Sequence, residues 1–393
     1  MPRRIDLRER RARLARRHRL APHTRATGVE EVAAALVALH ATDPATVHLA
    51  AGARLAEPSV AAVERALYED RTLVRMLGMR RTMFVVPRAS VPVVQAACTD
   101  TVAANQRRLL IQHLTEAGVA EDPAAWLADV GDATVRALAA RGEATGTELA
   151  RDEPRLRTQL KMADGKPYAT VANVTTRVLN VLGADGRIVR GQPRGSWISS
   201  QYRWSTTETW LRGGPEPWSA AAARTELARQ WLLAYGPAPA SDLRWWAGWT
   251  AGELKRALSG LDMVEVELDG GGTGLLLAED TEPVPDEPPW VALLPALDPT
   301  VMGWASREWF LGPHAATLFD RTGNAGPTVW SDGRVVGGWG QARTGEVRYR
   351  LLEDVGSEVA GQVGRAAAEL TAWLGPIRVT PRFRTPLERE LAG

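Results

Sequence analysis

Three side chains that could hold a water molecule or act on a bond fall within four residues, in the segment LHATDP at positions 39–44. His40 could accept a hydrogen bond from water or act as a base, since an unperturbed imidazole has a pKa of about 6.5. Thr42 supplies a hydroxyl that could hold water or a phosphate. Asp43 is the nearest carboxylate, but Asp followed by Pro44 is also typical of the N-cap and first residue of a helix. The segment predicts either a small polar site or a helix start beside a core histidine.

The stretch before this segment predicts where His40 lies. Thr27 and Glu30 have the spacing of a capping box and predict a helix from Glu30 to His40. His40 would then lie at the C-terminal end of that helix, where the carbonyl dipoles favour the charged imidazolium. This position works against a base role at neutral pH.

Residues for metal or covalent chemistry are scarce. Cys98 is the only cysteine, which excludes an intramolecular disulfide and a cysteine cluster. The six histidines lack the close helical pairing of a zinc protease. Lysine occurs only at positions 161, 166 and 255, which disfavours Schiff-base lyase chemistry. We expect no metal and no cofactor.

Basic side chains occur where contact with a nucleic acid would need them. Almost all are arginines, which bind phosphate bidentately and read guanine edges, although a GC-rich genome would give the same composition. Lys255 and Arg256 fall on a predicted helix that has the place of the recognition helix in a helix-turn-helix motif, the helix that contacts the bases. Candidates in predicted hairpins for phosphate or minor-groove contact are Arg80, Arg81, Arg190, Arg194 and Arg334. Trp245, Trp246 and Trp249, by contrast, favour a core role over base stacking.

The totals describe a globular chain of several units. At about 150 residues per domain, 393 residues predict two to four units. The net charge of +2 argues against a histone-like polycation. No apolar stretch approaches the roughly 18 residues of a membrane helix, and the arginine-rich start lacks the apolar core of a secretory signal. We expect a cytoplasmic, nucleoid-associated protein, and a monomer because no coiled-coil pattern is present.

An internal repeat gives the organisation of the chain. LAARGEATGTEL at 138–149 and LLAYGPAPASDL at 232–243 match without gaps at their leucine, glycine and acidic positions. Each predicts a helix ending at a glycine, a polar turn and a second helix. Helix Thr170–Leu182, strand Arg187–Arg190 and a return strand near Trp197 follow the first copy. A capping box at Thr250–Glu253, strand Met263–Leu268 and return strand Leu275–Leu277 follow the second.

Three helices followed by a hairpin is the order of a winged helix, and a fainter version occupies Arg17–Leu36. The hairpin of this first unit is expected at Leu73–Val86, and Arg3–Leu20 predicts a helix whose basic face is either solvated or bound to phosphates. After a linker at Thr281–Pro289, the rest of the chain is β-rich. Its predicted elements are the strands Trp290–Leu294, Thr328–Trp330 and Val335–Trp339, the helix Glu358–Leu374 and the strand Ile377–Phe383.

Five segments in this order resemble a bacterial winged-helix DNA-binding family that includes the AlkZ and YcaQ DNA glycosylases. They are LHATDP (39–44), RRTMFVVP (80–87), LLAYGPAPASDLRWWAGW (232–249), LLPALDP (293–299) and DGRVVGGW (332–339). The resemblance implies an α+β fold of three tandem winged-helix units and a small C-terminal β-barrel-like domain. We place the boundaries at 1–130, 131–213, 214–282 and 283–393. It also implies a concave surface that binds double-stranded DNA.

The resemblance further implies a catalytic position. Glycosylases of the family carry Gln-x-Gln or Gln-x-Asp where this chain has His40-Ala41-Thr42, so both side chains differ. One hypothesis is a monofunctional DNA glycosylase that excises N-alkylated purines or unhooks crosslinks, with His40 and Thr42 positioning the water and Asp43 nearby. The other is a DNA-binding protein without catalysis, such as a regulator or lesion binder.

Overall fold

The computed structural model describes residues 3–162, 170–213 and 216–393. This part of the chain is a mixed α and β fold. It contains five sheets of two to four strands, and none of these closes into a barrel. The small barrel expected at the C-terminus is therefore an open sheet.

One order of elements occurs first between residues 29 and 87: a helix, a short strand, two helices and a hairpin. The elements are α2 (Val29–Ala35), β2 (Leu39–His40), α3 (Pro44–Gly52), α4 (Val60–Glu64) with the π-helical turn η2 (Arg65–Glu69), β3 (Leu73–Leu77) and β4 (Met83–Pro87). β4 lies between β2 and β3 in one sheet. The expected hairpin is confirmed, and Asp43 caps α3 as predicted.

The helix before His40 is shorter than predicted. α2 ends at Ala35, and His40 pairs with Phe84 of β4. The predicted capping box is absent, because the Thr27 hydroxyl donates to Glu31 (2.7 Å) and Gly28 is the N-cap residue. His40 thus lies in the edge strand β2, beyond the end of α2.

The same order of elements returns twice. The second occurrence comprises α7 (Pro123–Arg141), β5 (Glu143–Ala144), α8 (Gly146–Asp152), α9 (Thr175–Ala184), β8 (Ile188–Pro193) and β9 (Tyr202–Thr206), with η6 (Pro154–Arg157), β6 (Gln159–Met162) and β7 (Thr170–Asn173) inserted before α9. The third comprises α11 (Ala220–Tyr235), α12 (Ala240–Ala247), α13 (Ala251–Leu258), β10 (Met263–Leu268) and β11 (Thr273–Leu277). Here a bridge from Ala238 to Leu275 takes the place of the short strand. The predicted Thr250–Glu253 capping box is present.

Two predicted boundaries in the second unit are wrong. Thr170–Asn173 is a strand, because it pairs with β6, so the helix begins only at Thr175. The return strand is β9, whereas Trp197 lies in the preceding loop and is buried against the ring of His48 at 5.0 Å. In both cases the pairing of two neighbouring strands in a hairpin decides the outcome.

The N-terminal segment is a strand followed by a helix, where one helix was predicted. β1 (Arg3–Ile5) pairs parallel with β10, and Asp6 caps α1 (Leu7–Arg17). Arginines of α1 form ion pairs with acidic residues of the protein itself. Arg13 is 1% exposed and bonds to Glu9 and Asp280, and Arg17 also bonds to Asp280.

The C-terminal region is an antiparallel sheet in the order β12–β13–β14–β15, with helices around it. Its elements are β12 (Val291–Leu294), α14 (Pro299–Met302), α15 (Glu308–Leu311), α16 (Ala315–Leu318), β13 (Thr328–Ser331), β14 (Arg334–Gln341), β15 (Val347–Leu351), α17 (Gly356–Leu374) and α18 (Pro386–Ala392). The strand predicted at Ile377–Phe383 is absent. The backbone groups of this segment bond to the side chain of Gln341 instead of to a neighbouring strand. The Gln341 amide donates to Ile377 O (3.0 Å) and accepts from Val379 N (2.8 Å).

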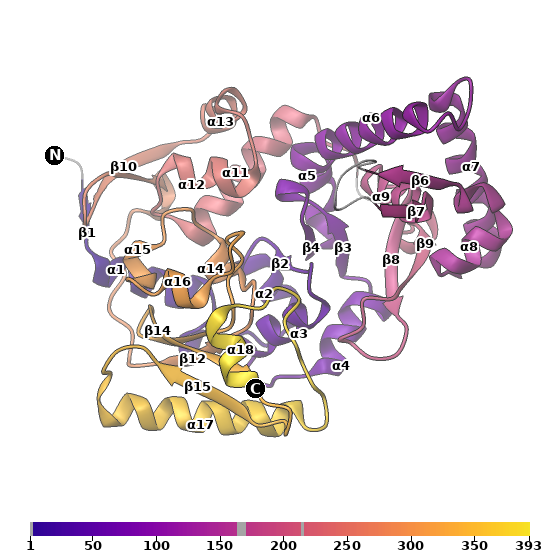
Figure 1. Ribbon diagram of the computed structural model, residues 1–393. Coiled ribbons are helices and arrows are strands. Elements are labelled where there is room, and N and C mark those ends of the chain that lie inside the picture. The colour runs from indigo at the N-terminus through magenta and orange to yellow at the C-terminus, as the bar shows by residue number, and fades with distance from the viewer. Residues whose placement is uncertain (1–2, 163–169, 214–215) are drawn as a thin grey trace.

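The remaining elements connect these parts. They are η1 (Pro22–Thr24), η3 (Met79–Arg81), η4 (Arg88–Ser90), α5 (Val91–Val94), η5 (Gln95–Thr99), α6 (Asp100–Glu116), α10 (Thr207–Trp210) and η7 (Ala278–Asp280). Figure 1 shows α6–α9 in a lobe at the right, α11–α13 at the top, and the C-terminal sheet with α17 at the bottom. β3 and β8 lie side by side where the right-hand lobe meets the rest of the molecule.

A buried ion pair joins the first unit to the C-terminal region. Both Arg54 and Asp298 are 0% exposed, and two guanidinium nitrogens bond the two carboxylate oxygens at 2.6 and 2.9 Å. Arg54 also donates to Thr300 and to the carbonyl of His18. Asp298 also caps α14.

We predict that Asp298→Ala lowers the free energy of unfolding by about 3–5 kcal/mol, because it leaves the buried Arg54 charge without a carboxylate to balance it. Urea denaturation followed by tryptophan fluorescence measures this loss. The exposed acid of the Arg350–Glu390 pair provides the control, and Glu390→Ala should leave the urea midpoint nearly unchanged. Equal midpoints for both variants would contradict the structural role of the buried pair.

Candidate functional site

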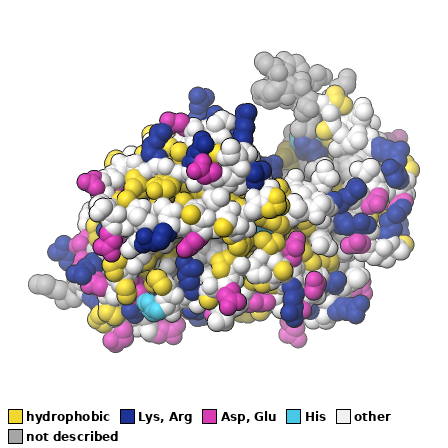
Figure 2. All heavy atoms as spheres, turned by 90° about the horizontal axis from the view of Figure 1, so that it is seen from below, with side chains coloured by type: hydrophobic (Ala, Val, Ile, Leu, Met, Phe, Trp, Pro, Cys, Tyr) yellow, Lys and Arg dark blue, Asp and Glu magenta, His cyan; other side chains and the backbone are white. Residues whose placement is uncertain are grey.

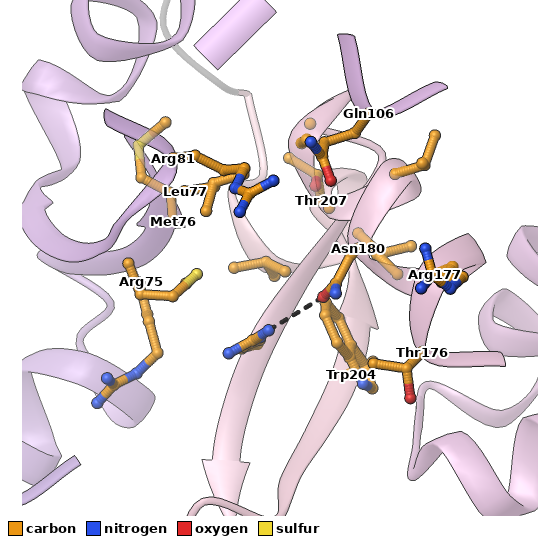
Figure 3. A pocket seen from close by; sticks show the side chains of 18 of the residues that line it. Arg75, Met76, Leu77, Arg81, Gln106, Thr176, Arg177, Asn180, Trp204 and Thr207 are labelled. Carbon is orange, nitrogen blue, oxygen red and sulfur yellow. Dashed lines mark hydrogen bonds between the residues drawn. The ribbon is translucent and has the colours of Figure 1, made fainter. Parts of the chain in front are cut away.

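A cleft of about 740 Å³ opens between the first and second units. Figure 3 shows Arg75, Met76 and Leu77 of β3 on one side, and Thr176, Asn180 and Trp204 of the second unit on the other. The two walls come from different units, so the packing of β3 beside β8 and α9 creates this space.

The cleft is lined by cations. Five arginines face it, namely Arg75, Arg81, Arg177, Arg190 and Arg382, whereas no Asp or Glu is among the described residues of its lining. Elsewhere the charges are mixed: on the face seen in Figure 2, basic and acidic side chains are interspersed. In a chain with a net charge of only +2, the cleft is therefore a local concentration of positive charge suited to an anionic ligand.

A second groove of about 330 Å³ continues from this cleft. Arg81 and Gln106 line both, and the groove runs on past Gly248 and Trp249 to Glu253 in the first turn of α13. The concave track thus touches all three units.

Two arginines of the cleft hold the backbone of the His40–Asp43 segment. Arg75 donates to the carbonyl of Ala41 (3.1 Å), and Arg382 donates to that of Thr42 (3.4 Å). Thr42 is partly exposed. The segment singled out in the sequence therefore lies directly behind the cationic cleft.

His40 is a neutral imidazole here. It is 5% exposed, its ring lies edge-on to Phe84 at 5.3 Å, and its buried Nδ1 has no hydrogen-bond partner among the described residues. Burial lowers the pKa of His40 to about 3, and the charge of Arg80 acts in the same direction. This corrects the expectation of a charged imidazolium, because the strand position removes the carbonyl dipoles on which that expectation rested.

Both carboxylate oxygens of Asp43 accept hydrogen bonds from backbone N–H groups. One carboxylate oxygen accepts from Ala45 N (3.1 Å) as the cap of α3, and the other accepts from Arg382 N (2.9 Å). Burial raises the pKa of this carboxyl, and the two backbone hydrogen bonds oppose the shift. Both oxygens thus serve to position α3 and the segment that contains Arg382.

The turn between β3 and β4 carries Arg80 and Arg81 in left-handed conformations, with φ of 51° and 57°. Arg80 stacks on Trp245 at 3.8 Å, and Gly248 packs closely against its backbone. Burial lowers the pKa of Arg80 to about 10. Arg81 is exposed at the point shared by the cleft and the groove. Of the two, Arg81 is the one available to a ligand.

The other basic residues predicted to contact DNA lie at different distances from the cleft and the groove. Arg190 faces the cleft and bonds to Asn180 at 3.2 Å, and Arg194 is exposed after β8. Lys255 and Arg256 are exposed on α13, one turn beyond the end of the groove. Arg334 pairs with Glu353 (3.0 Å) in a separate, partly acidic groove beside α1, so the structure does not bring it to the others.

Sequence reasoning missed Arg75 and Arg382. Arg75 has a signal in the sequence, since it is the one charged residue in the otherwise apolar strand LVRML. Arg382 has none, because it reaches the cleft from a segment that was predicted as a strand. Trp246 and Trp249 are buried in the main core as predicted, and Trp245 packs against them.

Comparisons with known proteins agree on one family. A family model described as "DNA glycosylase AlkZ-like" matches residues 33–373. The solved structure of Streptomyces sahachiroi DNA glycosylase AlkZ is similar, with a TM-score of 0.70 and 21% identity, over 93% of this chain and 97% of that one. None of the curated proteins matches the sequence. In the described residues there is no group of three metal-ligating side chains, and every helix is too short or too polar to cross a bilayer.

The neutral state of His40 predicts a dependence of stability on pH. Unfolded chains take up a proton at this histidine below pH of about 6.5, whereas the folded protein resists protonation until pH of about 3, so acid favours unfolding in this window. Between pH 7 and pH 5 His40 should account for a loss of about 2 kcal/mol in the free energy of unfolding.

The measurement compares urea unfolding at the two pH values for the wild type and for His40→Gln, which carries the residue that the family resemblance places there. The variant should lose less stability in acid by this amount. The exposed His23 offers a matched control, and His23→Gln should keep the full acid loss. An acid loss in His40→Gln as large as in the wild type would contradict a neutral, buried His40.

Proposed function

Since the chain belongs to the AlkZ-like DNA glycosylase family, we propose that it binds double-stranded DNA along the cleft and hydrolyses the bond between an N-alkylated purine and its sugar. The observation that carries the proposal is the cationic cleft, whose arginines also hold the carbonyls of Ala41 and Thr42. Through these hydrogen bonds, the surface suited to phosphates adjoins His40 and Thr42, the positions at which the family resemblance places the paired polar side chains.

We read the repeated order of elements as three tandem winged-helix units with a C-terminal β-rich region, and we keep the boundaries 1–130, 131–213, 214–282 and 283–393. The support is the position of the last strand of each unit. β4 and β9 are the middle strands of their sheets, and β11 lies between β10 and the bridge at Ala238. In this arrangement Lys255 and Arg256 extend the DNA contacts of the track, and Arg194 adds a contact from the second wing. A monomer in the bacterial cytoplasm, associated with the nucleoid, fits this function.

For the reaction, the N-alkylated purine already carries a positive charge that weakens its bond to the sugar. The C1′–N bond would break with its electron pair on the purine, which leaves as a neutral base, while the water oxygen bonds to C1′ and gives its proton to solvent. Neutral His40 and the Thr42 hydroxyl would orient this water. Asp43 would contribute through its charge and through the position of α3. The chemistry calls for no metal and no cofactor, and crosslinked bases are substrates of the same kind.

A second candidate is DNA or lesion binding without excision, and the electrostatics of the segment favour it. Arg75 and Arg382 place positive charge beside Ala41 and Thr42, whereas both oxygens of Asp43 are already engaged. A cationic sugar in the transition state is poorly stabilised in such surroundings.

DNA binding is tested by the dependence of affinity on salt. The logarithm of the affinity for a short duplex should fall linearly with the logarithm of the salt concentration, with a slope of about −0.9 for each phosphate contacted. Arg81→Ala should reduce the slope by about one contact. Arg365→Ala, on the exposed face of α17, should not change it. Absence of DNA affinity even at low salt would refute both candidate functions.

Excision is tested by incubating the protein with duplex DNA that carries N7-alkylguanine and measuring the released base. We expect release by the wild type, and a decrease of about a hundredfold or more in His40→Ala and Thr42→Ala with unchanged DNA affinity. If the wild type binds this DNA but releases no base between pH 5 and 9, the non-catalytic candidate holds. Release by His40→Gln/Thr42→Asp alone would then locate the difference in these two side chains.

A further inference from the structure

Three arginines of the cleft come from three distant parts of the chain and face the same space: Arg75 of β3, Arg190 of β8 and Arg382 from the segment after α17. We propose that these three arginines form a binding site for one backbone phosphate of the DNA. This inference rests on the proposed function and adds to it the group that fixes the register of the DNA on the protein.

The three guanidinium groups bond to neutral acceptors, and the carboxylate near them, Asp43, accepts from the backbone N–H groups of Ala45 and Arg382. Arg75 bonds to a backbone carbonyl, Arg190 to the side-chain oxygen of Asn180, and Arg382 to a backbone carbonyl, all of them neutral acceptors. Arg75 is only 3% exposed, and its buried Nε has no partner in the described part of the chain. A buried cation with an unused donor at the edge of a cleft is unfavourable unless a ligand completes it.

Aromatic rings hold two of the three charges near one another. Arg75 and Arg190 lie over the ring of Tyr202, at 4.8 and 5.7 Å, and Arg190 also lies over Trp204 at 5.1 Å. Burial lowers the pKa of Arg190, and the charges of Arg75 and Arg382 lower it further. The repulsion therefore exists in the free protein and is relieved by an anion.

The chemistry of the site fits a phosphate diester. Guanidinium groups bind phosphate oxygens through parallel N–H donors, and three of them can serve two non-bridging oxygens. The cleft does not end at the three arginines, because it continues past Arg81 and Gln106 into the groove beside α13. An open track of this kind favours a phosphate within a long strand over a free ion.

The position of the site gives it a consequence for the reaction. Arg75 and Arg382 also hold the carbonyls of Ala41 and Thr42, so a phosphate bound to them lies beside the His40–Thr42 segment. Its negative charge offsets the positive charges that would otherwise oppose a cationic sugar there. The DNA thus supplies a second anion there, besides Asp43, whose two oxygens accept backbone hydrogen bonds.

The test pairs a neutral linkage in the DNA with a neutral side chain in the protein. A set of short duplexes, each with one methylphosphonate at a different position, is titrated with the wild type and with Arg382→Met; Arg382 is exposed, so its variant should fold. At one position, replacing the phosphate by the methylphosphonate should weaken binding by the wild type about tenfold. The same replacement should not weaken binding by Arg382→Met, which has already lost this contact. Arg190→Met should show the same coupling, and Arg365→Met on α17 should show none.

Two further outcomes overturn the site without touching the proposed function. Suppose that the duplex still binds, and that at every linkage the affinity lost through the methylphosphonate adds to the affinity lost through the arginine substitution. The three arginines then contact no single phosphate. If inorganic phosphate at constant ionic strength raises the melting temperature of the wild type but not of Arg382→Met, and no linkage couples, the ligand is a free anion. Absence of duplex binding by the wild type would instead refute the proposed function itself.

Discussion

The buried ion pair between Arg54 and Asp298 fixes the helix on which the candidate site depends. Arg54 follows directly after α3, and Asp43 caps the other end of that helix. α3 is therefore held at its C-terminal end by the region around α14, and at its N-terminal end by backbone groups that include Arg382 N. The segment His40–Thr42 precedes this helix directly, so its place is set by contacts to parts of the chain that lie far away in sequence.

The site combines a cationic surface with an uncharged reactive centre. Arginines line the cleft, whereas His40 is kept neutral by burial and by the charge of Arg80. A neutral imidazole can orient water but cannot compensate a positive sugar, and the one carboxylate close by is engaged in two backbone hydrogen bonds. The arrangement makes the negative charge of a bound nucleic acid part of the local electrostatics.

The sequence predicted those features that depend on neighbouring residues. The Asp43 cap, the hairpin at Leu73–Val86, the Thr250–Glu253 capping box and the element order of the two repeats are all local patterns, and the structure contains them. The errors arose where a distant partner decides. His40 is in a strand because it pairs with Phe84, and Ile377–Phe383 is not a strand because the side chain of Gln341 takes its hydrogen bonds. The cleft itself arises from the packing of two units, which no local pattern reports.

The pairing of the first strand has a consequence for how the protein is made. Arg3 lies beside Val266 in the sheet, and the arginines of α1 find their acids at Asp280 and Glu287. A ribosome releases these partners only after it has synthesised the first two units and most of the third. Until then β1 has no strand to pair with, and of the acids that bind the arginines of this segment only the nearby Glu9 is present.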